Sequence, residues 1–414
     1  MSAVRSAPLP DMATGDDAGN PEAHAPSVRV DAISHLRAWI TVLVVGHHAV
    51  LAYHPYAPQV PKSLVTSSRI WGAFPIVDSA RWTGFSLFVS SNEMFFMALM
   101  FLLSGLFVWP SLVRKGAGGY LRDRALRLGV PFVVAAGVIA PLAYHFTYLQ
   151  MGNAGGWAGF WRQWSTPGVW ASGPAWFLWV LLAFDVVLAA VYAAAPRTGD
   201  ALAGLVARLR SPGVAFAALA LASAATLIVL ELPVGGLSWW TWGPFAVQTS
   251  RVLQYFAYFV FGVGLGALGL ERTVFAPGGA LARQWKLWLG IASVAFVAAT
   301  AAIIAAFSMK PLTLAVHLGA DVAYAVSGAA SSFAALALFL RFATRRGGVL
   351  GALAPCAYGM YLVHYPIVAA IQYALLPAPL PGFVKGVVVF AAAVSLSWGL
   401  VGLLRRIPGV ARVI

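Results

Sequence analysis

The sequence predicts an all-α, polytopic membrane protein with about ten transmembrane helices. Of its 414 residues, 60% are hydrophobic and only 10% are charged, whereas ordinary soluble domains carry roughly a quarter charged residues. The apolar residues form runs long enough to cross a bilayer, which takes ~20 residues. Lys and Arg residues gather in the short loops between these runs. The net charge of +14 therefore indicates membrane topology rather than a nucleic-acid partner.

The chain divides into three regions. Residues 1–30 are polar and lack the apolar core of a signal peptide, so we expect a disordered cytoplasmic tail. Residues 31–406 form the transmembrane domain, and residues 407–414 a short cytoplasmic C-terminal tail. The ten apolar segments of the transmembrane domain are, in chain order, 38–55, 85–109, 128–148, 174–195, 213–231, 252–270, 287–307, 317–340, 353–376 and 384–404.

The distribution of positive charge predicts the orientation. If the N-terminus is cytoplasmic, most of the 27 Lys and Arg residues face the cytoplasm, as in most membrane proteins. We therefore expect a multi-pass protein of the inner (cell) membrane with both termini in the cytoplasm. The longest loops, 56–84, 149–173 and 232–250, then face outward and are rich in Trp. These Trp residues fit either anchoring at the membrane interface or an aromatic platform for a sugar-like acceptor.

Ionisable residues within a bilayer are costly and usually functional. The candidates inside the predicted helices are His47, His48, Glu93, Asp185 and His364, with His145, His317 and Asp321 nearer the outer edge.

The first helix places Arg37 and His48 on one face. They are eleven residues apart, and at about 100° per residue they differ by only about 20° around the helix axis. The rise of ~16 Å puts His48 beyond mid-membrane while Arg37 stays at the cytoplasmic surface. His47 lies off this stripe. A neutral imidazole can act as a general base when a substrate hydroxyl approaches; a hydrogen-bonded core histidine is the alternative.

The other buried polar residues leave two interpretations open. Glu93 on the second helix reaches a depth close to that of His48, where it could orient the imidazole or bind acceptor hydroxyls. It could equally be a structural partner of Arg81 or of a backbone group. Asp185 and His364 are also mid-membrane, with functional and structural roles both open.

Two further features argue against other kinds of site. The stretch GLGALG (264–269) fits a nucleotide-binding pattern, but no strand precedes it, and it predicts close helix packing instead. Cys356 is the single cysteine, and no Cys/His spacing is typical of zinc, so no metal site is expected.

Four motifs follow one another along the chain: Arg37 and His48 with ten residues between them, FLLSGLF (101–107), Arg124-Ala-Leu-Arg127 within YLRDRALRLGVPF (120–132), and YGMYLVH (358–364). Together they resemble the acyltransferase 3 family, integral membrane proteins that move acyl groups onto extracytoplasmic carbohydrates, lipids and other acceptors. WFLWVLL (176–182) is similar to the branch that includes glucan biosynthesis protein C, which resembles a succinyltransferase for periplasmic glucans. The resemblance covers most of residues 30–406. One departure is Ser34, where many members have Asp.

The resemblance implies an O-acyltransferase, transferring groups other than amino-acyl groups, with His48 as its essential histidine, which we expect to be the catalytic base. Glu93 is a second catalytic candidate because of its similar depth. Guanidinium groups suit phosphate. Arg37, Arg124 and Arg127 are therefore expected to hold the nucleotide end of an acyl-CoA. Positive-inside topology and lipid headgroup contact are the alternative for these arginines.

Acyl-CoA is expected as the donor substrate, with no bound cofactor. The expected partners are acyl-CoA, an extracytoplasmic carbohydrate or lipid-linked acceptor, and the lipid bilayer. Asp185, Tyr361 and His364 are possible acceptor-binding or supporting residues. The acyl group, of the acetyl or succinyl class, and the acceptor both stay open.

Two interpretations of a different functional class compete with the acyltransferase. In a proton-coupled transporter, His48, Glu93, Asp185 and His364 would form a relay, although the two halves of the chain lack the matching broken helices of many transporters. The other competing interpretation is a non-catalytic membrane scaffold.

Overall fold

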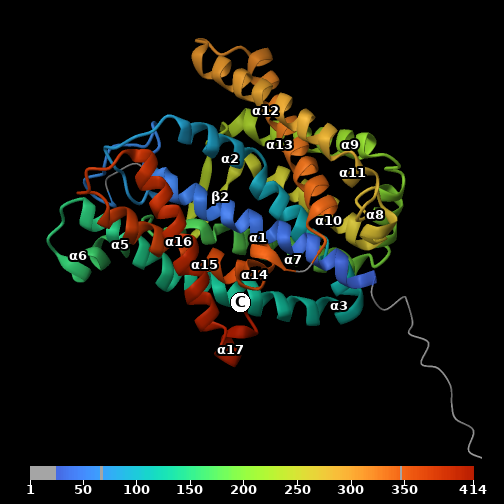
Figure 1. Ribbon diagram of the computed structural model, residues 1–414, viewed down its shortest axis with the longest axis horizontal. Helices are drawn as coiled ribbons and strands as arrows, with labels where there is room; N and C mark the ends of the chain where they lie inside the picture. The colour runs from blue at the N-terminus through green and yellow to red at the C-terminus, as the bar shows by residue number, and fades with distance from the viewer. Residues whose placement is uncertain (1–24, 66–68, 346) are drawn as a thin grey trace, which may run out of the picture.

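The computed structural model describes residues 25–65, 69–345 and 347–414, and the regular secondary structure of this part of the chain is helical apart from one hairpin (Figure 1). The hairpin pairs β1 (Trp239–Trp242) antiparallel to β2 (Phe245–Gln248). The α-helices of the described residues are α1 (Ala25–Leu51), α2 (Gly84–Gly105), α3 (Val108–Arg124), α4 (Val130–Val134), α5 (Ala140–Gln150), α6 (Gly156–Trp164), α7 (Trp176–Ala194), α8 (Thr198–Ala207), α9 (Pro212–Val234), α10 (Val252–Leu268), α11 (Ala280–Arg283), α12 (Trp285–Ser308), α13 (Leu314–Phe342), α14 (Gly348–Leu353), α15 (Ala357–Ala374), α16 (Gly382–Leu404) and α17 (Pro408–Ala411).

The helices confirm the all-α polytopic class. By length and composition, 9 helical segments of the described chain are long and apolar enough to cross a membrane. They coincide with the second to tenth of the expected segments. The first expected segment lies within α1, which is not among the 9, so the expected total of about ten is reached only by counting α1.

The structure adds short helical segments at both expected tails. α1 begins at Ala25, so a helix replaces the last part of the disordered tail expected over residues 1–30. Residues 1–24 of that tail lie outside the described residues. At the other end, the segment 407–414 contains α17 and folds back against the helices, where Ile414 packs beside Gly359.

α1 lies inside the bundle. It contacts α2, α13, α15 and α16 and runs across the middle of the molecule in Figure 1. α12, by contrast, lies at the edge and packs mainly on α13. Its apolar side chains Val294, Val297 and Ile304 are exposed, as expected for a helix that faces lipid. The central position of α1 explains why its polar residues can meet partners from several helices.

Glycines allow α2 and α10 to pack backbone to backbone. A Cβ on Gly262 would lie 2.0 Å from the carbonyl oxygen of Leu102, and one on Gly266 would lie 2.1 Å from that of Leu106. In the opposite direction, a Cβ on Gly105 would lie 2.2 Å from the carbonyl oxygen of Phe259. The prediction that GLGALG serves close packing is confirmed, and the glycine of FLLSGLF belongs to the same contact.

The segment from Val108 to Gln150 is continuous in sequence but irregular in geometry. Gly116 has φ +69° and interrupts α3. Two π-helical segments follow, η3 (Ala125–Gly129) and η4 (Ala135–Ile139). Each is followed closely by a proline, Pro131 or Pro141. Proline has no N–H to donate to the preceding turn, and inserted π turns of this kind are frequent at functional sites.

Candidate active site

A basic cavity of about 630 Å³ opens among α1, α3, α7 and α15. We call it the arginine cavity, and the end of the molecule where it lies the arginine end. All three arginines that the sequence suggested for donor binding, Arg37, Arg124 and Arg127, contribute to its wall. The cavity is of the size that holds a small-molecule ligand, roughly 300–1,000 Å³.

One face of α1 forms part of this cavity. Ser34, Arg37 and Thr41 line it, with the spacing of one helical stripe. α1 is continuous from Ala25 to Leu51, so His48 continues the same stripe beyond the cavity. Within the described residues, no carboxylate lies in ion-pair range of Arg37, whose side chain is exposed. Its guanidinium is therefore available to an anion.

Arg124 is held by a buried acidic partner. Its Nε lies 3.3 Å from Asp185 Oδ2, and Tyr120 donates a hydrogen bond from its hydroxyl to Asp185 Oδ1. Asp185 is fully buried. We expected Asp185 to act as a mid-membrane acceptor-binding or supporting residue; the structure makes it the partner of Arg124 at the arginine cavity. Two buried charges of opposite sign need such pairing because an unpaired one is costly.

Arg127 reaches the cavity by a different route from Arg124. A regular helix would place Arg127 on the same face as Arg124, but Arg127 lies in the π-helical segment η3 and its side chain is exposed. Pro131 cannot donate to the carbonyl of Arg127, and the hydroxyl of Tyr358 donates to that carbonyl instead. Tyr358, the first tyrosine of YGMYLVH, therefore supplies the hydrogen bond that the Arg127 carbonyl lacks at the break in the helix.

Tyr361 connects the arginine cavity to the imidazoles. Its ring lines the cavity, its hydroxyl donates to the carbonyl of Pro174, and its own carbonyl accepts from His364 Nδ1 at 2.7 Å. His364 lies one helical turn further along α15 and is fully buried. The cavity thus ends about one turn from His364.

His48 and His364 form a hydrogen-bonded pair. His364 Nε2 lies 3.1 Å from His48 Nδ1, and the carbonyl of Val44 lies 2.9 Å from the same Nδ1. The two carbonyl contacts assign the tautomers: each Nδ1 carries its proton, and His364 Nε2 accepts from His48. Within the described part of the chain, nothing hydrogen-bonds to His48 Nε2. That nitrogen keeps a free lone pair.

His47 has a separate set of contacts. Its Nε2 lies 3.4 Å from Glu93 Oε1, and its ring lies against Phe96. The other carboxylate oxygen of Glu93 accepts from Arg251 at 3.1 Å. Neither of the expected partners of Glu93 is correct: it contacts His47 rather than His48, and Arg251 rather than Arg81. Its side chain is 42% exposed, so it is accessible as well as paired.

Two contacts of His48 escaped the sequence analysis. Tyr365 places its ring edge-on to the His48 ring at 5.2 Å, and Gln372 donates to the backbone carbonyls of His48 and Ala49. Tyr365 and Gln372 both lie on α15, as does His364. Tyr365 directly follows the YGMYLVH motif, and Gln372 lies two turns beyond it. Their closeness to this motif is the feature of the sequence that could have pointed to them.

The loop tryptophans divide into buried and exposed groups. Trp164 is 1% exposed and belongs to the packed core, whereas Trp157 stacks on His145 with ring centroids 3.7 Å apart and stays partly exposed. Trp239, Trp240 and Trp242 on β1 are all exposed. Lys385, in the first turn of α16, is buried and pairs with Asp78 at 2.7 Å.

The comparisons with known proteins give one match. The sequence model of the family described as "Acyltransferase domain" matches residues 30–402. No curated protein and no solved structure matches the chain.

Proposed function

We propose a donor, a base and a direction of transfer for this chain, which belongs to the acyltransferase 3 family and is therefore a multi-pass membrane O-acyltransferase. The donor is an acyl-CoA bound in the arginine cavity. The base is His48. The acceptor is a hydroxyl group that approaches His48 from the end opposite the arginine cavity.

The observation that carries the proposal is the continuity between the cavity and the imidazole pair. Arg37 and Arg127 have no ion-pair partner within the described residues, so both guanidinium groups are available to phosphate. The rise from Arg37 to His48 along α1 is ~16 Å, similar to the length of a pantetheine arm. A nucleotide bound at the arginines would thus place its thioester near His48, past Tyr361.

The chemical step uses the free nitrogen of His48. His48 Nε2 takes the proton of the acceptor hydroxyl as its oxygen attacks the thioester carbonyl. The carbon–sulfur bond then breaks, and the proton passes from His48 to the departing thiolate, so no proton is gained or lost. His364 Nε2 accepts the His48 Nδ1 proton throughout, which orients the ring and spreads the positive charge formed during attack.

The acceptor and orientation follow from the charge pattern and the exposed aromatic residues. We propose that the arginine end faces the cytoplasm, where acyl-CoA is made, across the inner membrane. The opposite end then meets an extracytoplasmic glycan or lipid-linked acceptor. The exposed Trp239, Trp240 and Trp242 suit stacking against sugar rings, in keeping with the similarity of WFLWVLL (176–182) to glucan-modifying relatives.

The contacts do not favour the transporter alternative. Its relay needs His48, Glu93, Asp185 and His364 in one chain of contacts. Within the described residues, His48 hydrogen-bonds to His364, Glu93 contacts His47, and Asp185 pairs with Arg124 beside the arginine cavity. The ring of His47 lies between Glu93 and His48, 5.4 Å from the His48 ring by centroid, and Asp185 contacts Arg124 and Tyr120 rather than the other three residues of the relay.

Donor binding is the first prediction. Arg127→Ala and Arg37→Ala, in protein purified in detergent, should raise the KM for acetyl-CoA or succinyl-CoA with little change in kcat, because charge-assisted phosphate contacts are lost. Arg124→Ala is less suitable because it also leaves Asp185 unpaired. The matched control is Arg122→Ala, an exposed arginine of the same segment outside the cavity wall. An unchanged KM in both cavity variants would mean that the donor binds elsewhere.

The acceptor requires an unbiased measurement. Surface glycans and lipids of a deletion strain should lack an acyl ester that the parent strain carries, and mass spectrometry identifies both the acyl group and its carrier. Complementation with the wild-type gene should restore the ester, whereas His48→Ala should not.

A further inference from the structure

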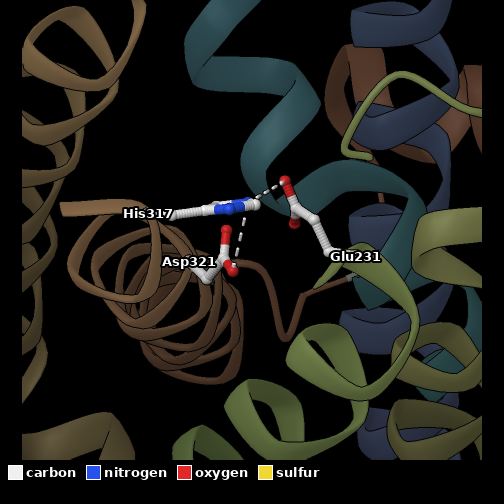
Figure 2. A group of neighbouring side chains, drawn as sticks. All are labelled: Glu231, His317 and Asp321. Carbon is white, nitrogen blue, oxygen red and sulfur yellow. Dashed lines mark ion pairs between the residues drawn. The ribbon is translucent and has the colours of Figure 1, made fainter. Parts of the chain in front are cut away.

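A second polar cluster lies away from the imidazole pair. Glu231 at the end of α9 approaches His317 and Asp321 on the first turns of α13, and the three side chains converge on one point (Figure 2). They line a cavity of about 670 Å³ together with Arg251 and Tyr324. Nothing in the acyl-transfer scheme uses this cluster.

The three donor atoms have a spacing close to that of a metal site. His317 Nε2 lies 3.8 Å from Glu231 Oε1 and 3.8 Å from Asp321 Oδ2, and all three donor atoms lie within 4.8 Å of one another. In a tetrahedral zinc site with bonds of ~2.0–2.2 Å, neighbouring donors are roughly 3.4 Å apart. The two distances to His317 Nε2 would therefore need to shorten by only a few tenths of an ångström to suit a bound cation.

Asp321 indicates that the cluster is incomplete without a ligand. Its side chain is 4% exposed, and its Oδ2, which faces the cluster, has no hydrogen-bond partner within the described residues. The neighbouring cation Arg251 hydrogen-bonds to Glu93. Two carboxylates therefore face a single imidazole, and buried carboxylates of this kind are normally paired or bound to a metal.

Gly236 leaves room for the third donor. A Cβ at this position would lie 2.3 Å from Glu231 Oε1, the oxygen nearest His317. An alanine at position 236 would therefore force the Glu231 carboxylate to move from its present place. This contact offers a way to displace Glu231 without removing any donor atom.

We propose that Glu231, His317 and Asp321 bind a first-row divalent cation such as Zn²⁺, with a fourth coordination position open to the cavity. One imidazole and two carboxylates suit Zn²⁺ or Mn²⁺ better than Mg²⁺, which prefers all-oxygen octahedral sites. The open position suits a water molecule or an oxygen of a ligand in the cavity. His317 and Asp321 are one helical turn apart, but Glu231 lies on another helix, so the sequence spacing did not predict the site.

Metal binding to the full chain in detergent tests the proposal without any assay of acyl transfer. After dialysis against a chelator, the wild type should take up about one Zn²⁺ per chain by elemental analysis, and Zn²⁺ should raise its thermal unfolding midpoint while Mg²⁺ does not. Asp321→Asn and His317→Ala should each abolish uptake. Gly236→Ala should weaken Zn²⁺ affinity on the order of 10–100-fold, as changes that misorient a metal ligand do.

The matched control is His54→Ala, which removes a histidine outside the cluster and should retain wild-type uptake. Glu231→Gln serves as the conservative variant if a larger change prevents folding. Wild-type protein that takes up no Zn²⁺ or Mn²⁺ would overturn the proposal. Equal uptake by wild type and Asp321→Asn would overturn it as well.

Discussion

Two adjacent histidines on α1 have different neighbours, and this difference determines their chemistry. His48 faces α15 and shares a proton with His364, whereas His47 faces α2 and pairs with Glu93. Successive residues point about 100° apart on a helix, so one position along the sequence is enough to exchange one partner for another. His48 continues the stripe that lines the arginine cavity, and only it combines that position with an unoccupied nitrogen.

Replacement of these histidines is the second prediction. His48→Ala should lower acyl-transfer turnover by about 10²–10⁴-fold, the usual effect of losing a general base. His48→Gln should not restore turnover because an amide cannot take up a proton at neutral pH. His47→Ala should cost far less, as its contacts are with Glu93 and Phe96. The measurement is turnover of the purified variants at equal folded concentration, and equal mild losses would assign both histidines a structural role.

The Arg124–Asp185 pair supplies the third prediction. Asp185 is fully buried, so Arg124→Met leaves a carboxylate without its counter-charge, which typically destabilises by about 3–5 kcal/mol. The double variant Arg124→Met with Asp185→Leu should recover much of this loss because it buries no charge. A double-mutant cycle of unfolding free energies in mixed detergent micelles measures the coupling. Additive effects would show that the two side chains do not depend on each other.

The position of a side chain was predictable from the sequence where helical periodicity alone determines it. The shared face of Arg37 and His48 needs only a regular helix, and α1 is regular over that length. The partner of His48 is 316 positions away, and only the packing of α15 on α1 reveals it. Glu93 shows the limit of arguing from depth: a similar distance into the membrane did not place it on the side of α2 that meets His48.

At the scale of elements, small residues set how closely helices approach. α2 and α10 meet through Gly105, Gly262 and Gly266, and their backbones lie where side chains would otherwise be. Without a hydrophobic driving force between helices in lipid, such close van der Waals contact stabilises association. GLGALG, read from sequence as a packing stretch, therefore belongs to one of the main helix contacts of the bundle.

The close backbone contact between α2 and α10 gives the fourth prediction. Gly262→Ala places a Cβ against the backbone carbonyl of Leu102, which cannot rotate away, and overpacking of this type costs about 1–3 kcal/mol. Gly290→Ala on α12 is the matched control because no atom lies within 4 Å of its added Cβ. It should be neutral or stabilising by about 0.5–1 kcal/mol. Unfolding in mixed micelles compares the two, and equal stability would contradict the close packing of α2 on α10.

Helix boundaries depended on features that hydropathy does not report. The expected segment 128–148 corresponds to a stretch broken by two π-helical turns, each near a proline. A hydropathy pattern averages over such breaks. The side chains that compensate for them come from distant elements, as when the hydroxyl of Tyr358 reaches the carbonyl of Arg127. The assumption of a regular Arg-x-x-Arg face failed for this reason.

At the scale of the whole molecule, the polar residues discussed above form three separate groups. The arginine cavity lies at one end, the imidazole pair lies about a turn beyond it, and the Glu231 cluster lines a separate cavity bordered by α9 and α13. Composition and hydropathy were sufficient for the class of fold because the membrane restricts spanning segments to helices. They could not give the order of helices in space, and therefore not these three groupings, because long-range packing decides which buried residues meet.

The orientation of this arrangement in the membrane is the fifth prediction. The acyl-transfer scheme requires the arginine cavity to face the cytoplasm, and the excess of Lys and Arg in alternate loops predicts that orientation. Reporter fusions after Pro196 and Arg405 should therefore report the cytoplasm, and fusions near Lys62, Trp157 and Pro379 the outside. Fusion at Trp157 is the most informative, since α6 follows the segment Val108–Gln150, which begins beside the arginine cavity and ends on the side that the scheme assigns to the acceptor. A cytoplasmic signal there would reverse the molecule, put Arg37 and Arg127 outside the cell, and leave a cytoplasmic acyl-CoA without access to the cavity that we propose binds it.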